Sequence, residues 1–253
     1  ATQSIALAGS TFKPFALAAA LESGIPLTSM WNGDTPQTFD DAGKPYIVNN
    51  YGDEGWGQID LMTATAHSVN TVYVPLGIKA GPDKVVDVIR RAGIPNSVAL
   101  MPTPSISLGV ASPHVIDVAA AYATFAANGV YAKPFMVTKV LGPNRGVLYE
   151  AKPTPQTVFS KEVMADLTYA LQGVVKSGTA TGGTAGFGRP AAGKTGTSEQ
   201  NASAWFSGYT PQLATSVAMF RDDETQTLNG IGGLNSVTGG SFPARIWNLY
   251  TKV

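Results

Sequence analysis

AGSTFKPFALAAALESG, residues 8–24, is the stretch that decides the fold. Its apolar residues recur at helical spacing and it closes on a glycine, which is typical of a helix and its end. Ser10 and Lys13 stand three positions apart at the predicted helix start, so their side chains fall on one face. Pro14 fits that start, because proline is tolerated in the first turn of a helix. We therefore expect a helix that opens with a serine beside a lysine.

This pair has a chemical and a plain structural interpretation. A serine hydroxyl is a useful nucleophile near neutral pH only when a base takes its proton. Lys13 can be that base only as the neutral amine, which requires burial or a nearby second cation to lower its pKa. A serine at a helix start is more often a simple cap, and Ser-x-x-Lys arises by chance about once in a chain of this length. The pair therefore needs support from elsewhere in the sequence.

A second candidate motif is AHSVNTVY, residues 66–73, which lies between two predicted helices. Ser68 could relay a proton to a leaving amine, and the amide of Asn70 could bind a peptide-like substrate. Either residue could equally be a helix cap. The motif carries little weight alone.

The third motif is AGKTGTSEQ, residues 192–200, at the end of a predicted strand. Lys194, Thr195 and Thr197 offer one cation and two hydroxyls, which suit a carboxylate. Gly196 removes a side chain where a substrate backbone could approach closely. The alternative is a strand end with an incidental lysine.

In this order, Ser-x-x-Lys, Ser-x-Asn and Lys-Thr-Gly are the motif set of penicillin-binding proteins and serine β-lactamases. Longer segments resemble the transpeptidase domain of class A, bifunctional penicillin-binding proteins from residue 8 to about residue 248. These segments are AGSTFKPF (8–15), SVNTVY (68–73), ISLGVASPHVIDVAAAYATFAANGV (106–130), AGKTGTSEQNASAWFSGYTP (192–211) and GGSFPARIW (239–247).

The resemblance also has departures. Ser203 stands where an acidic residue often precedes the Ala-Trp-Phe run. The strands and linker that family members carry before the serine helix are not in this sequence, nor are a glycosyltransferase domain and membrane anchor. We therefore expect the N-terminal strands to be missing from this chain and the sheet to have an unpaired edge.

The resemblance implies a role for each catalytic residue. Ser10 attacks the terminal D-Ala-D-Ala bond of a peptidoglycan stem peptide, Lys13 takes its proton, and Ser68 returns a proton to the leaving D-alanine. The backbone N–H groups of Ser10 and Thr197 form the oxyanion hole. The substrate is bound by Asn70, Lys194, Thr195, Gly196 and Thr197. A neighbouring stem peptide then supplies the acceptor amine, and β-lactams imitate the donor.

Helical patterns come first, strand patterns follow, and a helix ends the chain, which predicts an α+β fold. The resemblance implies the serine β-lactamase and penicillin-binding-protein type, an antiparallel sheet flanked by helices with a mainly helical subdomain. We expect one domain, 1–253, helical over about 10–130, with hairpin and sheet over about 131–253. Residues 25–56 are turn-rich and predict an irregular surface connection. Other predicted helices are 58–67, 71–81, 81–93, 112–129, 160–176 and 241–253, and strands are expected in 135–151, 189–197, 203–210 and 213–220.

Composition excludes several kinds of site. The chain has 17 basic and 17 acidic residues, which gives no reason to expect nucleic acid as a partner. It has no cysteine, and His67 and His114 are its only histidines, so we expect no metal and no cofactor. No stretch approaches the ~18 apolar residues of a membrane span.

Two alternatives to a transpeptidase remain open. A serine β-lactamase needs a carboxylate that activates the deacylating water; Glu150 and Glu162 lie between the second and third motifs, in hairpin and helix contexts. A β-lactam sensor would stay acylated. For the transpeptidase we expect stem peptides and β-lactams as ligands, its own N-terminal segment or a glycosyltransferase domain as a partner, and the extracytoplasmic face of the bacterial cytoplasmic membrane as its location.

Other residues are weaker candidates. His67 beside the second motif is expected to pack or cap at a helix end, because Lys13 already fills the role of base. Trp205, Phe206 and Tyr209 could line a cleft but are expected in the core, as usual for aromatic residues on a strand. We interpret YGDEGWG, residues 51–57, as a solvated loop.

Overall fold

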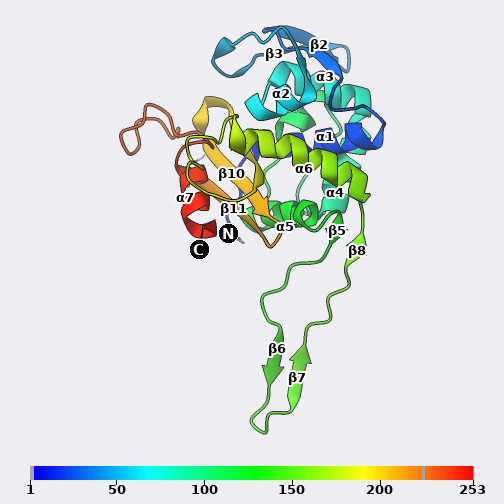
Figure 1. Cartoon of the computed structure of the whole chain (residues 1–253), viewed down its shortest axis with the longest axis vertical. Coiled ribbons are helices and arrows are strands. Elements are labelled where there is room, and N and C mark those ends of the chain that lie inside the picture. Colours follow the sequence, from blue (N-terminus) through cyan, green and yellow to red (C-terminus); the bar gives the residue numbers. More distant parts are fainter. Residues whose placement is uncertain (1–2, 224–225, 253) are drawn as a thin grey trace.

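The computed structural model describes residues 3–223 and 226–252 and has the expected α+β architecture (Figure 1). Its helices are α1 (Lys13–Glu22), α2 (Leu61–His67), α3 (Asn70–Ala80), α4 (Pro82–Ala92), α5 (Val115–Ala126), α6 (Lys161–Lys176) and α7 (Phe242–Thr251), with short 3-10 helices η1 (Gly9–Phe12), η2 (Tyr51–Asp53), η3 (Pro104–Leu108) and η4 (Glu199–Asn201). Its strands are β1 (Met30–Asn32), β2 (Gln37–Asp41), β3 (Lys44–Val48), β4 (Gln58–Asp60), β5 (Val130–Tyr131), β6 (Lys139–Leu141), β7 (Val147–Glu150), β8 (Gln156–Thr157), β9 (Ala192–Thr197), β10 (Ser203–Thr210) and β11 (Leu213–Phe220).

The main sheet is antiparallel, with strand order β11-β10-β9, which confirms the three strands predicted in succession. Both α5 and α7 contact β10 and β11, and α6 contacts β9. Within the described residues β11 pairs only with β10, so its other edge is unpaired. Because α6 also packs on α1 and α2, it joins the helical part to the sheet. The predicted C-terminal helix is present as α7, and Val253 lies outside the described residues.

Helix α1 is the central core helix. Its residues from Lys13 to Ala20 are all buried, and it contacts α3, α4 and α6. A helix that is apolar around its whole circumference belongs in a core, and its small alanines let neighbouring helices approach closely. The lysine of the first motif is thereby carried into the interior of the molecule.

The chain enters α1 differently from the prediction. Ser10 lies in the 3-10 helix η1, and the α-helix begins only at Lys13. The preceding Gly9 has a φ of +54°, and a Cβ there would stand 3.0 Å from the carbonyl oxygen of Thr197. Glycine is needed because this turn is left-handed and packs directly on β9. The sequence pattern identified the helix but not the tight turn that presents the serine.

The prediction of an irregular connection over 25–56 was wrong in part. The segment contains β1 and the hairpin of β2 and β3, paired from Gln37 and Val48 to Asp41 and Lys44. Its two-residue loop is Ala42–Gly43, with φ values of +52° and +82°. Such a loop has the backbone of a type I′ turn, for which Asn-Gly is the usual signal. The hairpin was missed because alanine stands in the first loop position.

Helix α5 starts later than the predicted helix over 112–129. Its N-cap is His114, and its first helical residue is Val115. The carboxylate of Asp117 accepts a hydrogen bond from the backbone N–H of His114 at 3.1 Å. An isolated bridge between His114 and Ile5 keeps this residue extended, which delays the helix. The helix predicted over 160–176 is present as α6, and the Ser160 hydroxyl caps it by accepting from the Val163 N–H.

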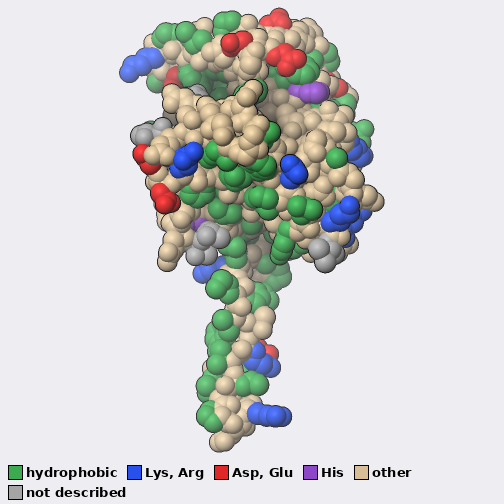
Figure 2. All heavy atoms as spheres, turned by 90° about the vertical axis from the view of Figure 1, so that its left-hand side faces the viewer, with side chains coloured by type: hydrophobic (Ala, Val, Ile, Leu, Met, Phe, Trp, Pro, Cys, Tyr) green, Lys and Arg blue, Asp and Glu red, His purple; other side chains and the backbone are tan. Residues whose placement is uncertain are grey.

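The expected hairpin over 135–151 is present as β6 and β7, and it projects from the body as an arm (Figure 1). Apolar side chains along the arm are exposed, as Figure 2 shows, including Met136 at 91% and Leu148 at 71%. At its base, β5 and β8 pair beside α5.

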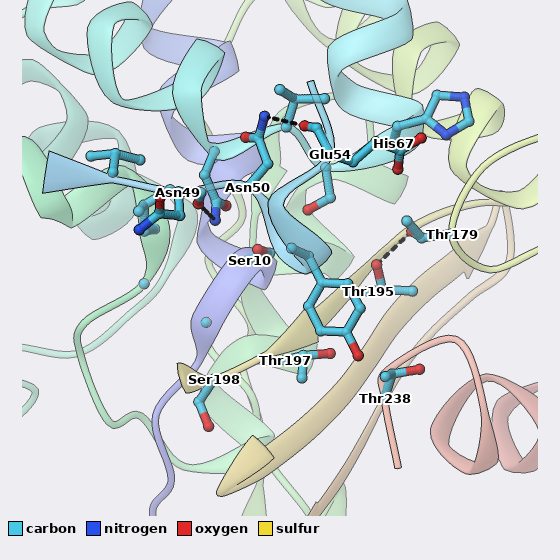
Figure 3. A pocket seen from close by; sticks show the side chains of 18 of the residues that line it. Ser10, Asn49, Asn50, Glu54, His67, Thr179, Thr195, Thr197, Ser198 and Thr238 are labelled. Atoms are coloured by element: carbon cyan, nitrogen blue, oxygen red, sulfur yellow. Dashed lines mark hydrogen bonds between the residues drawn. The ribbon is translucent and has the colours of Figure 1, made fainter. Parts of the chain in front are cut away.

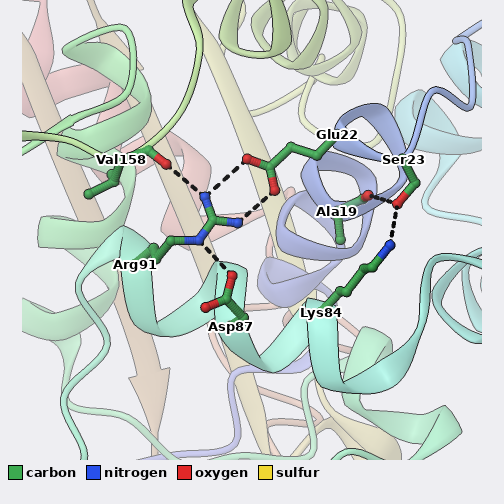
Figure 4. Close-up of polar contacts among 7 residues, drawn as sticks. All are labelled: Ala19, Glu22, Ser23, Lys84, Asp87, Arg91 and Val158. Carbon is green, nitrogen blue, oxygen red and sulfur yellow. Dashed lines mark hydrogen bonds and ion pairs between the residues drawn. The ribbon is translucent and has the colours of Figure 1, made fainter.

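The end of α1 is tied to α4 by one arginine (Figure 4). Arg91 forms a two-pronged ion pair with Glu22, at 2.6 and 3.0 Å, and also contacts Asp87 at 2.6 Å. It donates a further hydrogen bond to the carbonyl of Val158 at 2.7 Å. A half-exposed bidentate pair that also bonds the backbone fixes geometry better than a single surface pair.

No helix within the described residues is long and apolar enough to cross a membrane.

Candidate active site

A cleft of about 900 Å³ lies between α2, α3 and the end of β3 on one side and η1 with β9 on the other (Figure 3). The three sequence motifs meet here, although they are far apart in the chain. Residues lining the cleft include Ser10, Ser68, Asn70, Thr195 and Thr197. Lys13 and Lys194 lie beneath this surface, and each is fully buried.

Lys13 is held by the second motif and not by Ser10. Its Nζ donates to the backbone carbonyl of Ser68 at 2.5 Å and to Asn70 Oδ1 at 2.6 Å, and it lies 3.0 Å from Ser68 Oγ. Within the described part of the chain no hydrogen bond joins it to the Ser10 hydroxyl, which faces the cleft from η1. Burial lowers the pKa of Lys13 well below its usual value, and the nearby charge of Lys194 lowers it further.

Lys194 approaches the same oxygen from β9. Its Nζ lies 2.7 Å from Ser68 Oγ and 3.2 Å from the carbonyl oxygen of Thr195. Burial lowers its pKa to about 7. Ser68 occupies a left-handed position after α2, with φ 61° and ψ 39°, which directs its side chain between the two lysines. Such strained residues persist where the surrounding structure fixes them, often at functional sites.

The hydroxyls of the third motif are also oriented. Thr195 Oγ1 shares a hydrogen bond of 2.6 Å with Thr179 Oγ1 (Figure 3), and Thr197 Oγ1 accepts from the N–H of Gly239 at 3.2 Å. Within the described residues the Thr197 hydroxyl accepts this hydrogen bond and donates none, so its own hydrogen is available for a ligand in the cleft.

Gly196 is needed for a different reason from the one expected. A Cβ at this position would stand 2.7 Å from the carbonyl oxygen of Ala8 and 2.8 Å from Thr11 Cγ2. The space that glycine leaves is therefore filled by the turn that carries Ser10. Gly196 lets the turn that carries Ser10 pack against β9, which makes it a structural part of the site.

Sequence reasoning missed three residues of this site. Thr179 follows α6, donates its backbone N–H to Ala66, and places its hydroxyl beside Thr195. Gly239 supplies the N–H that orients Thr197, and Asn50 lines the cleft although it is almost fully buried. A lone threonine, glycine or asparagine in a loop carries no distinctive signal, and each is informative only through a partner distant in sequence.

Of the weaker candidates, the structure supports the interpretations of His67 and of the β10 aromatic residues but not all of that for the loop 51–57. His67 packs on Trp56, with ring centroids 4.3 Å apart, as expected for a helix-end histidine. The aromatic residues of β10 are buried in the core, also as expected: Trp205, Phe206 and Tyr209. The loop 51–57 is exposed, but Glu54 and Trp56 line the cleft, so the solvated-loop interpretation was incomplete.

The Ser203 hydroxyl donates to the carbonyl of Leu7 at 2.7 Å and so ties β10 to the segment before η1. Across residues 3–223 and 226–252 the structure holds no cluster of three or more His, Cys, Asp or Glu side chains that could bind a metal ion.

The family model of the penicillin binding protein transpeptidase domain matches residues 1–230. Penicillin-binding protein 1A of Mycobacterium tuberculosis (strain ATCC 25618 / H37Rv) is 34% identical, over 94% of this chain and 31% of its own length. Penicillin-binding protein 1A of Aquifex aeolicus (strain VF5) is 32% identical, over 97% of this chain and 32% of its own length. The chain thus spans about a third of these relatives.

Solved structures agree at the level of the fold. Penicillin-Binding Protein 1A from Haemophilus influenzae superposes with a TM-score of 0.88 at 26% identity, covering 100% of this chain and 42% of that chain. PonA1 from Mycobacterium tuberculosis in complex with penicillin V gives 0.87 at 34% identity, covering 99% and 69%. The imipenem acyl-enzyme complex of penicillin-binding protein A from M. tuberculosis gives 0.83 at 25%, covering 100% and 61%. The three motifs meet at one cleft, and the family model matches most of this chain. The chain therefore belongs to the penicillin-binding protein transpeptidase family.

Proposed function

We propose that this chain is a peptidoglycan D,D-transpeptidase domain, which forms an acyl-enzyme at Ser10 with D-Ala-D-Ala stem peptides and passes the acyl group to an acceptor amine. The observation that carries the proposal is the position of Ser68, whose Oγ lies 3.0 Å from Lys13 Nζ and 2.7 Å from Lys194 Nζ. A hydroxyl so placed can move a proton between a buried base and a leaving amine. The relatives solved with penicillin V and as an imipenem acyl-enzyme support a covalent β-lactam target.

Acylation begins with neutral Lys13. Its two N–H bonds go to the carbonyl of Ser68 and to Asn70 Oδ1, which leaves its lone pair for a hydroxyl proton. The Ser10 hydroxyl and this amine come together as the substrate closes on the cleft, since catalytic hydrogen bonds often form only in the complex. Ser10 Oγ then bonds to the carbonyl carbon of the penultimate D-alanine, and its proton passes to Lys13.

The tetrahedral intermediate places a negative oxygen near the backbone N–H groups of Ser10 and Thr197. Loss of one such donor typically costs ~3 kcal/mol of barrier. As the intermediate collapses, the bond to the terminal D-alanine nitrogen breaks. The proton on Lys13 passes through the Ser68 hydroxyl to that nitrogen, so D-alanine leaves as a neutral amine and Lys13 is again neutral.

The second half-reaction runs in reverse. An amine of a neighbouring stem peptide attacks the ester on Ser10 and gives its proton to Lys13, and that proton returns to the Ser10 oxygen as the ester bond breaks. Water in place of the amine would give D,D-carboxypeptidase activity. A β-lactam would acylate Ser10 by opening its ring amide, and its leaving nitrogen stays tethered.

The carboxylate of the donor is proposed to bind the Lys194, Thr195 and Thr197 side of the cleft. The Thr197 hydroxyl, whose oxygen accepts from Gly239, directs its hydrogen toward this carboxylate. Lys194 contributes charge from beneath. Asn70 presents its amide to the donor peptide from the opposite wall.

The serine β-lactamase alternative is less well supported. Glu150 lies in β7 of the exposed arm and Glu162 in the first turn of α6, and neither lines the cleft. Glu54 does line it, from the 51–57 loop. A β-lactam sensor remains the second alternative, because a transpeptidase and a sensor would both be stably acylated by a β-lactam.

The proposed setting follows the family. Class A relatives suggest a glycosyltransferase domain as a partner, together with the chain's own N-terminal segment. Because the proposed substrate is peptidoglycan, the proposed location of the reaction is the extracytoplasmic face of the bacterial cytoplasmic membrane.

One experiment tests the nucleophile. The protein is incubated with a fluorescent penicillin and the adduct is followed by intact mass; the wild type is expected to be acylated once and Ser10→Ala not at all. An adduct retained by Ser10→Ala would refute the assignment. Rapid loss of the adduct would favour a β-lactamase, and turnover of a D-Ala-D-Ala peptide with an amine acceptor separates a transpeptidase from a sensor.

A further inference from the structure

The amide of Asn70 has two fixed partners. Its Oδ1 accepts from Lys13 Nζ at 2.6 Å, and its Nδ2 donates to the backbone carbonyl of Asn49 at 2.7 Å. A primary amide has two N–H bonds, so one of them stays available to the cleft that Asn70 lines. The position of the Asn49 carbonyl therefore decides which way this amide faces.

Asn49 is in turn fixed by its neighbour Asn50, which is only 6% exposed. Asn50 Oδ1 accepts from both the backbone N–H and the hydroxyl of Thr71, each at 3.1 Å. Its Nδ2 donates to the carbonyls of Gly33 at 2.8 Å and Glu54 at 2.9 Å, the latter drawn in Figure 3. One buried side chain thus ties the end of β3, the β1 region and the cleft loop to the first turn of α3.

We propose that Asn50 is a positioning residue for acyl transfer: by fixing Asn49 against the start of α3, it orients the Asn70 amide and, through Asn70, Lys13. The inference rests on the proposed function. Removing the Asn50 side chain leaves the Thr71 N–H and the Glu54 carbonyl without this partner, a state that protein interiors avoid, whereas the Gly33 carbonyl keeps the N–H of Trp56. The loop then shifts, the Asn49 carbonyl leaves Asn70, and the amide is free to turn.

The consequence for Lys13 has a definite sign. Among the described residues, the titratable groups facing Lys13 are Lys194 on β9 and Tyr73 on α3, whose ring centroid is 5.4 Å from Nζ. The hydrogen bond to Asn70 Oδ1 favours the charged amine, so its loss lowers the pKa of Lys13 further. The acidic limb of the acylation rate then moves to lower pH, while the maximum rate falls because the base is no longer held in place.

The test compares Asn50→Ala with the wild type, using the second-order rate constant for acylation by a fluorescent penicillin between pH 5 and about pH 10. We expect the maximum rate to fall about 10- to 100-fold, as for a small misplacement of a reacting group, and the acidic limb to shift to lower pH. The control is Asn248→Ala on α7. Asn248 is 9% exposed and donates Nδ2 to the carbonyls of Gly183 and Ala185, so it matches Asn50 in burial and in its two donated hydrogen bonds, away from the cleft, although its Oδ1 accepts none within the described residues. It should lower the melting temperature and leave the pH profile unchanged.

A milder pair keeps the inference testable if Asn50→Ala does not fold. Thr71→Val removes one of the two hydrogen bonds to Asn50 Oδ1 at nearly constant volume, whereas Thr71→Ser keeps the hydroxyl. Thr71→Val should slow acylation and shift the acidic limb, and Thr71→Ser should restore both. If the wild type is acylated and the variants lose stability but keep its rate and pH profile, the positioning role of Asn50 is wrong. The proposed function would still stand. A wild type that is never acylated would overturn the proposed function as well.

Discussion

Lys194 Nζ lies 2.7 Å from Ser68 Oγ, although the two residues are 126 positions apart in the chain. Lys13 Nζ lies 3.0 Å from the same oxygen. Two buried ammonium groups around one hydroxyl would repel each other, so the site favours one neutral and one charged lysine. The pKa of Lys194 is about 7, whereas that of Lys13 is lowered by burial and by Lys194. This division suits Lys13 as the base and Lys194 as the cation.

Substrate binding is expected to weaken with rising pH. Lys194, with a pKa of about 7, is charged below that pH and neutral above it, so its attraction for the donor carboxylate fades above pH 7. We expect the KM for a D-Ala-D-Ala peptide to rise by up to about tenfold per pH unit between pH 7 and pH 9. A donor with an amidated C-terminus should show no such rise. Equal pH dependence for both donors would contradict the role of Lys194.

Lys194 also carries a stability cost that depends on pH. Its folded pKa of about 7 lies below the ordinary 10.5, so the unfolded chain holds a proton that the folded chain has lost between those values. Stability from this group therefore rises with pH across that window, and its cost is greatest at and below pH 7. Lys194→Met should raise the melting temperature at pH 7, with a gain that shrinks towards pH 10, while activity is lost. The exposed Lys252→Met is the control and should leave the melting temperature unchanged.

The cap of α2 is expected to matter for both stability and rate. The Asp60 carboxylate accepts from the Thr63 N–H at 2.8 Å, and α2 ends at the residue before Ser68. Asp60→Ala should cost about 1 kcal/mol of unfolding free energy by denaturant titration, and it should slow acylation because α2 presents Ser68. Ser160→Ala removes a cap of the same kind from α6. A rate loss in Ser160→Ala equal to that in Asp60→Ala would show that the effect is not specific to α2.

The lifetime of the penicillin adduct should not depend on Glu54. This exposed carboxylate lines the cleft but makes no hydrogen bond to Ser10 or Lys13 in the described structure. If no carboxylate activates a deacylating water, Glu54→Gln should leave the deacylation half-life, followed by intact mass, unchanged. Asp53→Asn, an exposed neighbour outside the cleft lining, is the control. A much longer-lived adduct in Glu54→Gln alone would favour the β-lactamase alternative.

The sequence was informative where local signals and motif order agree. The helix that carries Lys13 was predictable from its apolar spacing, and β10 and β11 from two strand-like runs joined by a short turn. The meeting of Ser10, Ser68 and Lys194 came from the resemblance, because no local pattern brings distant segments together.

Other features could not be predicted, because no local sequence pattern indicates them. The β2–β3 hairpin closes on Ala42–Gly43, where an alanine in a left-handed position is stabilised by the pairing of the strands around it. Asn50 and Thr71 are 21 positions apart, and their hydrogen bonds depend on how β3 meets α3. Gly196 was correctly singled out for close approach, but its neighbour is the backbone of Ala8. In each case the deciding contact is tertiary.

The burial of residues 13–20 of α1 on every side has a consequence for how the protein loses activity. Residues 13–20 of α1 are buried, so their amides should exchange with deuterium only when the whole domain opens. Deuterium uptake in α1 should therefore report the global free energy of unfolding, and the turn that carries Ser10 should disappear in the same transition. Heating would then give one cooperative loss of penicillin labelling and fold together, with no inactive folded state in between.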